Sequence, residues 1–336
     1  MPVSIGAGVA IGAGWGIGTG GGAGPTPSPT FFPLSNTATD PTSATWQSNN
    51  PGYTFTPNVG ITTLTPMTDA SDMFTDNATF NDPDISTWDT SSITNMSYMF
   101  VNASAFDQSL DSWNTSNVTT MNTMFNGSAF NGNIGGWNTA NLTDAAGMFS
   151  NTPFNQAIGS WNTANVTNMS EMFFATTAFD QAIGSWNTAN VTNMQSMFQS
   201  AAVFNQAIGS WNTANVTNTS VMFRGAATFN QDIGSWNTAN VTNMNNMFSS
   251  APAFNCGQAS GAAHDLMQRT ATTGWQVGNV TNMNTMFDKA GAFNGDISNW
   301  CVTLIATTPS LFNRQTNVNW TVERQPTWGA CPYPNA

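Results

Sequence analysis

The sequence predicts an α/β solenoid: a leucine-rich-repeat-like stack of about nine to ten short strand–turn–helix coils with an extended Gly-rich N-terminal segment. Two observations carry this prediction. The phrase IGSWNTANVTN occurs four times at a fixed step, and apolar residues recur at the same places in every copy. A fixed period of this length indicates one small structural unit stacked many times. The phrase is centred on Trp161, Trp186, Trp211 and Trp236.

Four regions follow from the distribution of repeats, proline and glycine. Residues 1–24 form a Gly-rich assembly segment, and residues 25–58 form a Pro-rich spacer and N-terminal cap. The repeat solenoid covers residues 59–313 and carries an insertion at 255–274. A C-terminal cap is expected at 314–336.

Within the unit 154–178, a short extended piece from Ile158 to Trp161 is followed by a turn at Asn162. The next apolar residues are spaced i, i+3, i+6 and i+7, which is typical of one face of a helix. An isolated helix of two or three turns is marginal in water, so the unit needs neighbours above and below it. The four residues of this face are Val166, Met169, Met172 and Phe173.

The N-terminal segment has the period of a strand. Val3, Ile5, Val9 and Ile11 alternate with small residues, chiefly glycine, and glycine at alternate positions allows close approach to another chain. We therefore expect residues 1–24 to join the protein to a larger assembly, as a homo-oligomer. No lysine or arginine precedes the apolar stretch, so it does not predict a secretion signal. The stretch is also too rich in glycine and too interrupted to predict a membrane-spanning helix.

Composition excludes several partners. Charged residues make up only 7% of the chain, and the formal net charge is -12 with five basic residues. Such a chain cannot neutralise a run of phosphates, which excludes nucleic acid, and it does not favour anionic lipid.

The repeats resemble a known group, the bacterial surface-protein repeats of about 26 residues related to the BspA-like leucine-rich repeats. The pattern that carries the resemblance is F-[ND]-x-x-I-x-x-W-[ND]-[TV]-x-[NS]-V-T-[ND]-M-x-x-M-F, met best at 154–173, 179–198 and 229–248. This resemblance implies a non-enzymatic surface protein that takes part in adhesion. The Gly-rich N-terminal segment resembles the starts of some marine phage structural proteins.

The function expected from these observations is structural and adhesive. The protein would be displayed on the exterior of a virion or cell and would bind a glycan or protein receptor through the solenoid surface. Insertions in solenoids project from one face and often carry recognition, so the loop at 255–274 is one candidate contact surface. The candidate contact residues are Asn155, Gln156, Gln181, Gln206, Gln231, His264 and Asp265.

Two functions of other classes stay open. A glycan-degrading enzyme needs two carboxylates facing one groove, for which Asp84 and Asp265 are candidates. An ice-binding solenoid is the other alternative, since flat ladders of threonine and asparagine order water. The uneven repeat intervals of 24 to 26 residues speak against that alternative.

Catalysis at the insertion is the less favoured interpretation. Cys256 and His264 are a thiol and an imidazole, which form a nucleophile and base in some enzymes, but no orienting third group is identifiable. Glu171 is expected on an exposed helix face, as an ordinary solvated residue. We therefore predict no catalytic residue and no enzyme.

No cofactor is predicted, and the interpretation that stays open beside this is Ca²⁺ bound by oxygen ligands in the first coils. The alternative is an acidic end that keeps the first coil soluble. The residues of this possible site are Asp69, Asp72, Asp82 and Asp84.

The three cysteines do not have the spacing of a metal site. Three free thiols are the simpler interpretation. The alternative pairs Cys301 with Cys331, which ties the C-terminal tail to the last coil and requires an oxidising location.

Overall fold

A computed structural model describes most of the repeat region and the C-terminal cap. Most of the residues before the first coil, including the predicted assembly segment 1–24, lie outside the described residues. The described residues are 67–265, 267 and 275–332, together with the backbone of 30–32, 54–56 and 60–63.

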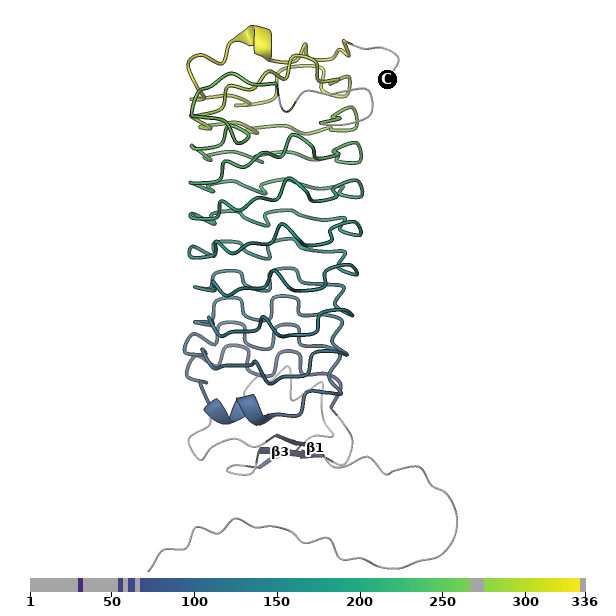
Figure 1. The fold of residues 1–336 in the computed structure, drawn as a ribbon, viewed down its shortest axis with the longest axis vertical. Coiled ribbons are helices and arrows are strands. Elements are labelled where there is room, and N and C mark those ends of the chain that lie inside the picture. Colours follow the sequence, from purple (N-terminus) through teal and green to yellow (C-terminus); the bar gives the residue numbers. More distant parts are fainter. Residues whose placement is uncertain are drawn as a thin grey trace, which may run out of the picture.

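The chain winds into coils that stack along one axis and form a long column (Figure 1). Eight parallel bridges, from Asp69↔Asn95 to Asn243↔Asn282, join one residue in each coil to its equivalent in the next. Because each coil contacts only the coils on either side of it, the column is a quasi-one-dimensional structure.

Regular secondary structure is confined to the ends. Three short strands form an antiparallel sheet of order β1-β3-β2 at the N-terminal end of the column (Figure 1). They are β1 (Thr30–Phe32), β2 (Thr54–Thr56) and β3 (Gly60–Thr63). The two 3-10 helices are η1 (Pro83–Thr87) and η2 (Val322–Arg324). No helix among the described residues is long and apolar enough to cross a bilayer.

The prediction of an α/β solenoid made of strand–turn–helix coils is therefore wrong. Neither an α-helix nor a β-strand occurs within the described coils 67–265 and 275–313, apart from the short 3-10 helix η1. The segment predicted as a helix is a run of turns. Its backbone N–H groups donate to the next coil: Met169 to the Asn193 carbonyl at 3.0 Å, and Phe173 to the Met197 carbonyl at 3.0 Å.

Left-handed backbone explains why the helix does not form. Glu171 and Ala175 have φ angles of 58° and 52°, and equivalent residues in the other coils also have positive φ. A left-handed residue breaks a right-handed helix and turns its N–H outward along the column. The turns nevertheless bury Met169 and Phe173 on one side, so a helix and a run of turns produce the same apolar spacing.

Phenylalanine fills the centre of the column in two rows. Successive rings are 5.5 Å apart for Phe74–Phe100 and 5.7 Å apart for Phe80–Phe106, while Phe74 and Phe80 of one coil stack at 3.8 Å. Both rows continue to Phe287 and Phe293 with the same geometry. Each ring buried in this way stabilises the fold by about 1.5–3 kcal/mol.

Tryptophan forms a third row at the edge of this core. Trp186 and Trp211 stack with ring centroids 6.4 Å apart, and Trp211 is only 3% exposed. The Trp211 indole N–H donates to the carbonyl of Ile183 in the preceding coil at 3.1 Å. The same bond recurs up the column, so the indole rings are core residues that also join the coils.

The C-terminal cap is tied to the last coil by a disulfide between Cys301 and Cys331. The interpretation of three free thiols is therefore wrong for these two residues, and Cys256 alone is free. A bridge across 30 residues stabilises by about 3–4 kcal/mol in the chain-entropy account.

Candidate functional site

The side chains of the predicted contact row at Asn155 mainly form hydrogen bonds from one coil to the next. The Asn155 carboxamide oxygen accepts the backbone N–H of Asp180 at 3.1 Å and the Gln181 side-chain amide at 2.9 Å. Gln206 and Gln231 donate their side-chain amides to the preceding coil in the same way. These side chains are half-buried, so a ligand reaches only part of each one.

Sequence reasoning missed a more accessible face of the column. In most coils the segment Asn-Val-Thr alternates: Asn190 and Thr192 are exposed, while Val191 between them is buried. The side chains therefore form two parallel exposed rows, separated by about 6–7 Å within a coil and by about 4.8 Å between coils. The signal was present in the sequence, because an apolar residue between two polar ones is typical of a half-buried extended segment.

We call these two rows the Asn/Thr face. It contains no charged residue. Its asparagines are Asn117, Asn141, Asn165, Asn190, Asn215, Asn240 and Asn279, and its threonines are Thr94, Thr119, Thr143, Thr167, Thr192, Thr217, Thr242 and Thr281.

Hydrogen bonds between coils hold the Asn/Thr face in register. The Asn190 side-chain amide donates to the Ala164 carbonyl at 2.7 Å, and the Thr192 hydroxyl donates to the Thr167 carbonyl at 3.2 Å. Both residues are exposed, and no hydrogen bond among the described residues uses the carboxamide oxygen of Asn190 or the lone pairs of the Thr192 hydroxyl. From Asn117 onward, the face therefore repeats the same uncharged acceptors from coil to coil.

The insertion continues the column in part. Asn255 and Cys256 are fully buried, and the Trp300 indole donates to the Met267 carbonyl at 2.9 Å. Met267 thus takes the place that an isoleucine or leucine has in the preceding coils. Residues 266 and 268–274 of the insertion lie outside the described residues.

Cys256 is not set up as a nucleophile. Its thiol lies 3.7 Å from an Asp232 carboxylate oxygen, and burial, followed by the Asp232 charge, raises the pKa of Cys256 to about 12. The thiol is therefore protonated at neutral pH, whereas nucleophilic cysteines react as thiolates.

His264 is half-buried and its Nε2 lies 3.1 Å from the Asn255 carboxamide oxygen. Its Nδ1 is buried and has no hydrogen-bond partner among the described residues. Burial lowers the pKa of His264, with Asp265 and Asp232 opposing that shift. Asp265 itself is exposed. The geometry therefore places the predicted contact residues His264 and Asp265 together at the insertion, with a neutral imidazole.

The aspartates near the N-terminal end are engaged locally. Asp69 accepts the backbone N–H of Ser71 at 2.9 Å, and Asp82 accepts that of Asp84 at 2.9 Å. Burial and the neighbouring Asp69 raise the pKa of Asp72. The described residues contain no group of three or more His, Cys, Asp or Glu side chains that could hold a metal ion.

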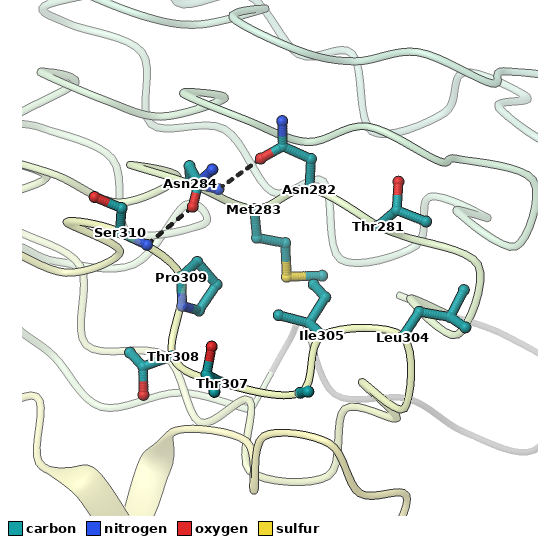
Figure 2. A pocket seen from close by; sticks show the side chains of 11 residues that line it. Thr281, Asn282, Met283, Asn284, Leu304, Ile305, Thr307, Thr308, Pro309 and Ser310 are labelled. Carbon is teal, nitrogen blue, oxygen red and sulfur yellow. Dashed lines mark hydrogen bonds between the residues drawn. The ribbon is translucent and has the colours of Figure 1, made fainter.

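A groove of about 470 Å³ opens beside the last complete coil (Figure 2). One wall is the segment 281–284, and the other is the segment 304–310. Figure 2 shows Met283 directed toward Ile305, with the Ser310 N–H bonded to the Asn284 carboxamide oxygen at one end. All the lining residues are uncharged.

These features define a repeat protein whose coils are joined by side-chain and backbone ladders. The sequence matches the family described as "Mycoplasma protein of unknown function, DUF285" over residues 50–158, 150–261 and 261–328. The chain belongs to this family. Comparison of the chain with curated proteins and with solved structures found no match.

Proposed function

We propose that this chain is a non-enzymatic structural and adhesion protein on the exterior of a virion or cell, which binds a glycan or protein receptor. The proposed role comes from the resemblance of the repeats to BspA-like surface repeats, and it goes beyond membership of the repeat family. It requires no cofactor. The observation that supports it most is the Asn/Thr face: a long, uncharged array of identical acceptors on a regular column.

The Asn/Thr face favours an uncharged, extended ligand. Hydrogen-bonding groups held in fixed positions lose little conformational entropy on binding, so a rigid array binds more tightly than a flexible one. The net charge of -12 speaks against polyanionic ligands, such as nucleic acid. A neutral glycan, or a polar protein surface, fits the chemistry of the face.

The disulfide and the buried thiol also support an exterior location and a non-enzymatic role. Disulfides form and persist in oxidising surroundings outside the cytosol, and Cys301–Cys331 is such a bond. The protonated thiol of Cys256 speaks against a role as a catalytic nucleophile.

The test is binding of the labelled protein to host cells and to a panel of neutral glycans. Thr192→Arg and Thr217→Arg each place a bulky cation on the Asn/Thr face, and we expect at least tenfold weaker binding. Thr177→Arg and Ala227→Arg are the matched controls, because both residues are exposed and lie outside the face. Equal loss in all four variants, or none in the first two, would contradict the proposed contact surface.

One observation favours ice binding as a second candidate. The uneven repeat intervals do not disturb the face: the bond from each asparagine to the preceding coil measures 2.7 Å at Asn117 and 2.8 Å at Asn279, beyond the insertion. These bonds therefore keep the asparagine row in register across the insertion, which an ordered polar face requires. Thermal hysteresis of the native protein, lost in Thr192→Arg and retained in Thr177→Arg, would support this candidate over adhesion.

A further inference from the structure

The backbone ladder between coils ends abruptly at the groove. In every preceding coil, a threonine carbonyl accepts an N–H from the next coil, and the N–H two residues later donates to that coil. Thr242 and Met244 show the pattern: the Thr242 carbonyl accepts from Thr281, and the Met244 N–H donates to the Asn282 carbonyl, both at 2.9 Å. The ladder passes through eight coils in this form.

The next coil breaks the pattern. Among the described residues, the Thr281 carbonyl and the Met283 N–H have no partner in a following coil. The ladder resumes two residues later, where the Thr285 N–H donates to the Ser310 carbonyl at 2.8 Å. The segment 304–309 bows away between these points, and the groove is the space that it leaves (Figure 2).

The two unpaired groups have the geometry of a strand edge. An extended dipeptide running parallel to the coil supplies an N–H to the Thr281 carbonyl and a carbonyl to the Met283 N–H, as Thr281 and Asn282 do for the coil below. Addition of a strand to an open edge is a recurrent mode of peptide recognition, in which backbone bonds give affinity and side-chain pockets give specificity.

Exposed apolar side chains are concentrated in the part of the chain that forms the far wall of the groove and follows it. The described residues have six exposed large hydrophobic side chains, and four of them belong to the segment 304–322. Leu304 lies on the groove itself and is 56% exposed. The others are Leu311, Val318 and Val322 at 47%, 95% and 73% exposed. Exposed apolar groups gathered at one end of a molecule indicate a contact with another protein.

The chain itself contains a segment that suits this edge. From Val3 to Ile17 every odd position holds Val, Ile, Ala or Trp, and every even position holds Gly, Ala or Ser. An extended segment with this period has one apolar face and one face that is nearly bare backbone. The bare face allows the close approach that pairing inside a narrow groove requires.

We propose that residues 3–17 of a second copy bind in this groove as an added parallel strand, which links the copies head to tail. Backbone bonds to Thr281 and Met283 would fix the register, and the apolar side chains would cover Leu304 and its neighbours. The interface is heterologous, so it leaves one free groove and one free N-terminal segment on every open assembly. The proposal is independent of the Asn/Thr face and of any receptor.

The test uses the full chain and measures its mass by light scattering over a range of concentrations. We expect species larger than the 35.7 kDa single chain. Leu304→Asp damages the groove, and Ile5→Asp damages residues 3–17, the donor segment that binds in it. Each variant should therefore remain at the single-chain mass. Val203→Asp is the control, since Val203 is an exposed valine on another coil, and it should assemble like the native protein.

Mixing the two damaged variants makes the test specific. Leu304→Asp retains an intact donor segment and Ile5→Asp retains an intact groove, so an equimolar mixture should restore a two-chain species. A peptide of residues 1–24 should break up the native assembly, while a peptide of the same composition with shuffled order should not. A native chain of single-chain mass at every concentration, or a mixture that stays monomeric, would overturn the proposal.

Discussion

At the scale of single residues, the column depends on places where a side chain is absent or held in an unusual conformation. At Gly159, Gly184 and Gly209 the backbone of the next coil leaves no room for a Cβ atom. A Cβ atom at Gly184 would lie 2.4 Å from the Ala207 carbonyl of the next coil. Glycine is therefore required here by contact between coils rather than by its own φ angle.

We expect Gly184→Ala to lower the free energy of unfolding by about 1–3 kcal/mol, because the new methyl group pushes two hydrogen-bonded coils apart. Gly136→Ala is the matched control, since a Cβ there meets nothing within 4 Å. That change should be neutral or slightly stabilising, by up to about 1 kcal/mol. Chemical denaturation measures both variants, and equal effects would contradict the close approach of the coils.

The only histidine sets a pH dependence near neutrality. Burial lowers the pKa of His264 below its ordinary value of 6.5, so the unfolded chain binds a proton at a higher pH than the folded chain does. Stability from the neutral imidazole is therefore full above the unfolded pKa and falls as pH drops from about 6.5 through the folded value. The melting temperature of the native protein should fall more between pH 7.5 and pH 5.5 than that of His264→Gln. Equal falls would show that His264 does not couple folding to protonation.

At the scale of the element, the basic unit is a run of turns, and each coil places two residues in the left-handed region. These are seldom glycine: Tyr98, Thr123 and Val221 have φ angles of 61°, 57° and 63°. A β-branched residue in this region is strained by about 1–2 kcal/mol. The Val221 N–H donates to the Asn245 carbonyl of the next coil at 2.8 Å, and this bond stabilises the strained conformation.

Val221→Asn should therefore raise the free energy of unfolding by about 0.5–1 kcal/mol, since asparagine tolerates the left-handed region. Asn246 occupies the equivalent position in the next coil, with a φ of 55°. Val203→Asn is the control, because Val203 is an exposed valine whose φ is not positive. If both changes had the same effect on the denaturation midpoint, left-handed strain at Val221 would be excluded.

The sequence predicted the period, the buried residues and the stacking, but not the turns. Val166, Met169, Met172 and Phe173 are all buried, as a helix face would require. Turns with left-handed residues give these side chains the same spacing, and nothing in the type of Glu171 or Ala175 marks a positive φ. The ladder of hydrogen bonds connects residues about 25 positions apart, and local propensity does not contain that information.

The same limit applies to the candidate site. The sequence identified the polar rows but placed the contact surface at Asn155 and Gln156, whose amides the structure engages between coils. The exposed alternation around Val191 could have been found from its period. The groove beside Met283 could not, since it depends on the course of the segment 304–309 in the last coil.

At the scale of the whole molecule, acidic and basic residues are separated along the column, and the backbone ladder has unpaired groups near the C-terminal end. The described first coils carry Asp69, Asp72, Asp76, Asp82, Asp84 and Asp89 without a basic residue. Lys289, Arg314 and Arg324, three of the five basic residues of the chain, lie in the last coils. Arg314 and Asp288 form an ion pair at 2.9 Å there.

Because stability is shared between nearest neighbours, the column should tolerate loss of a whole unit. Deleting residues 187–211 joins Trp186 to Asn212 and keeps every ladder in register, so the shortened protein should fold with a similar melting temperature. Deleting residues 187–198 instead puts core and surface positions out of register, and that protein should not fold. If both shortened proteins folded, or neither did, hydrogen bonds in register between neighbouring coils would not be what stabilises the column.

The most direct measurement is the scalar coupling across the hydrogen bond of Phe173, detected by NMR on a deuterated sample. Bonding between coils predicts coupling from the Phe173 amide nitrogen to the carbonyl carbon of Met197, 24 residues further along the chain. Coupling to the carbonyl carbon of Met169 instead would show an α-helix at this place, and would contradict a column joined by its turns.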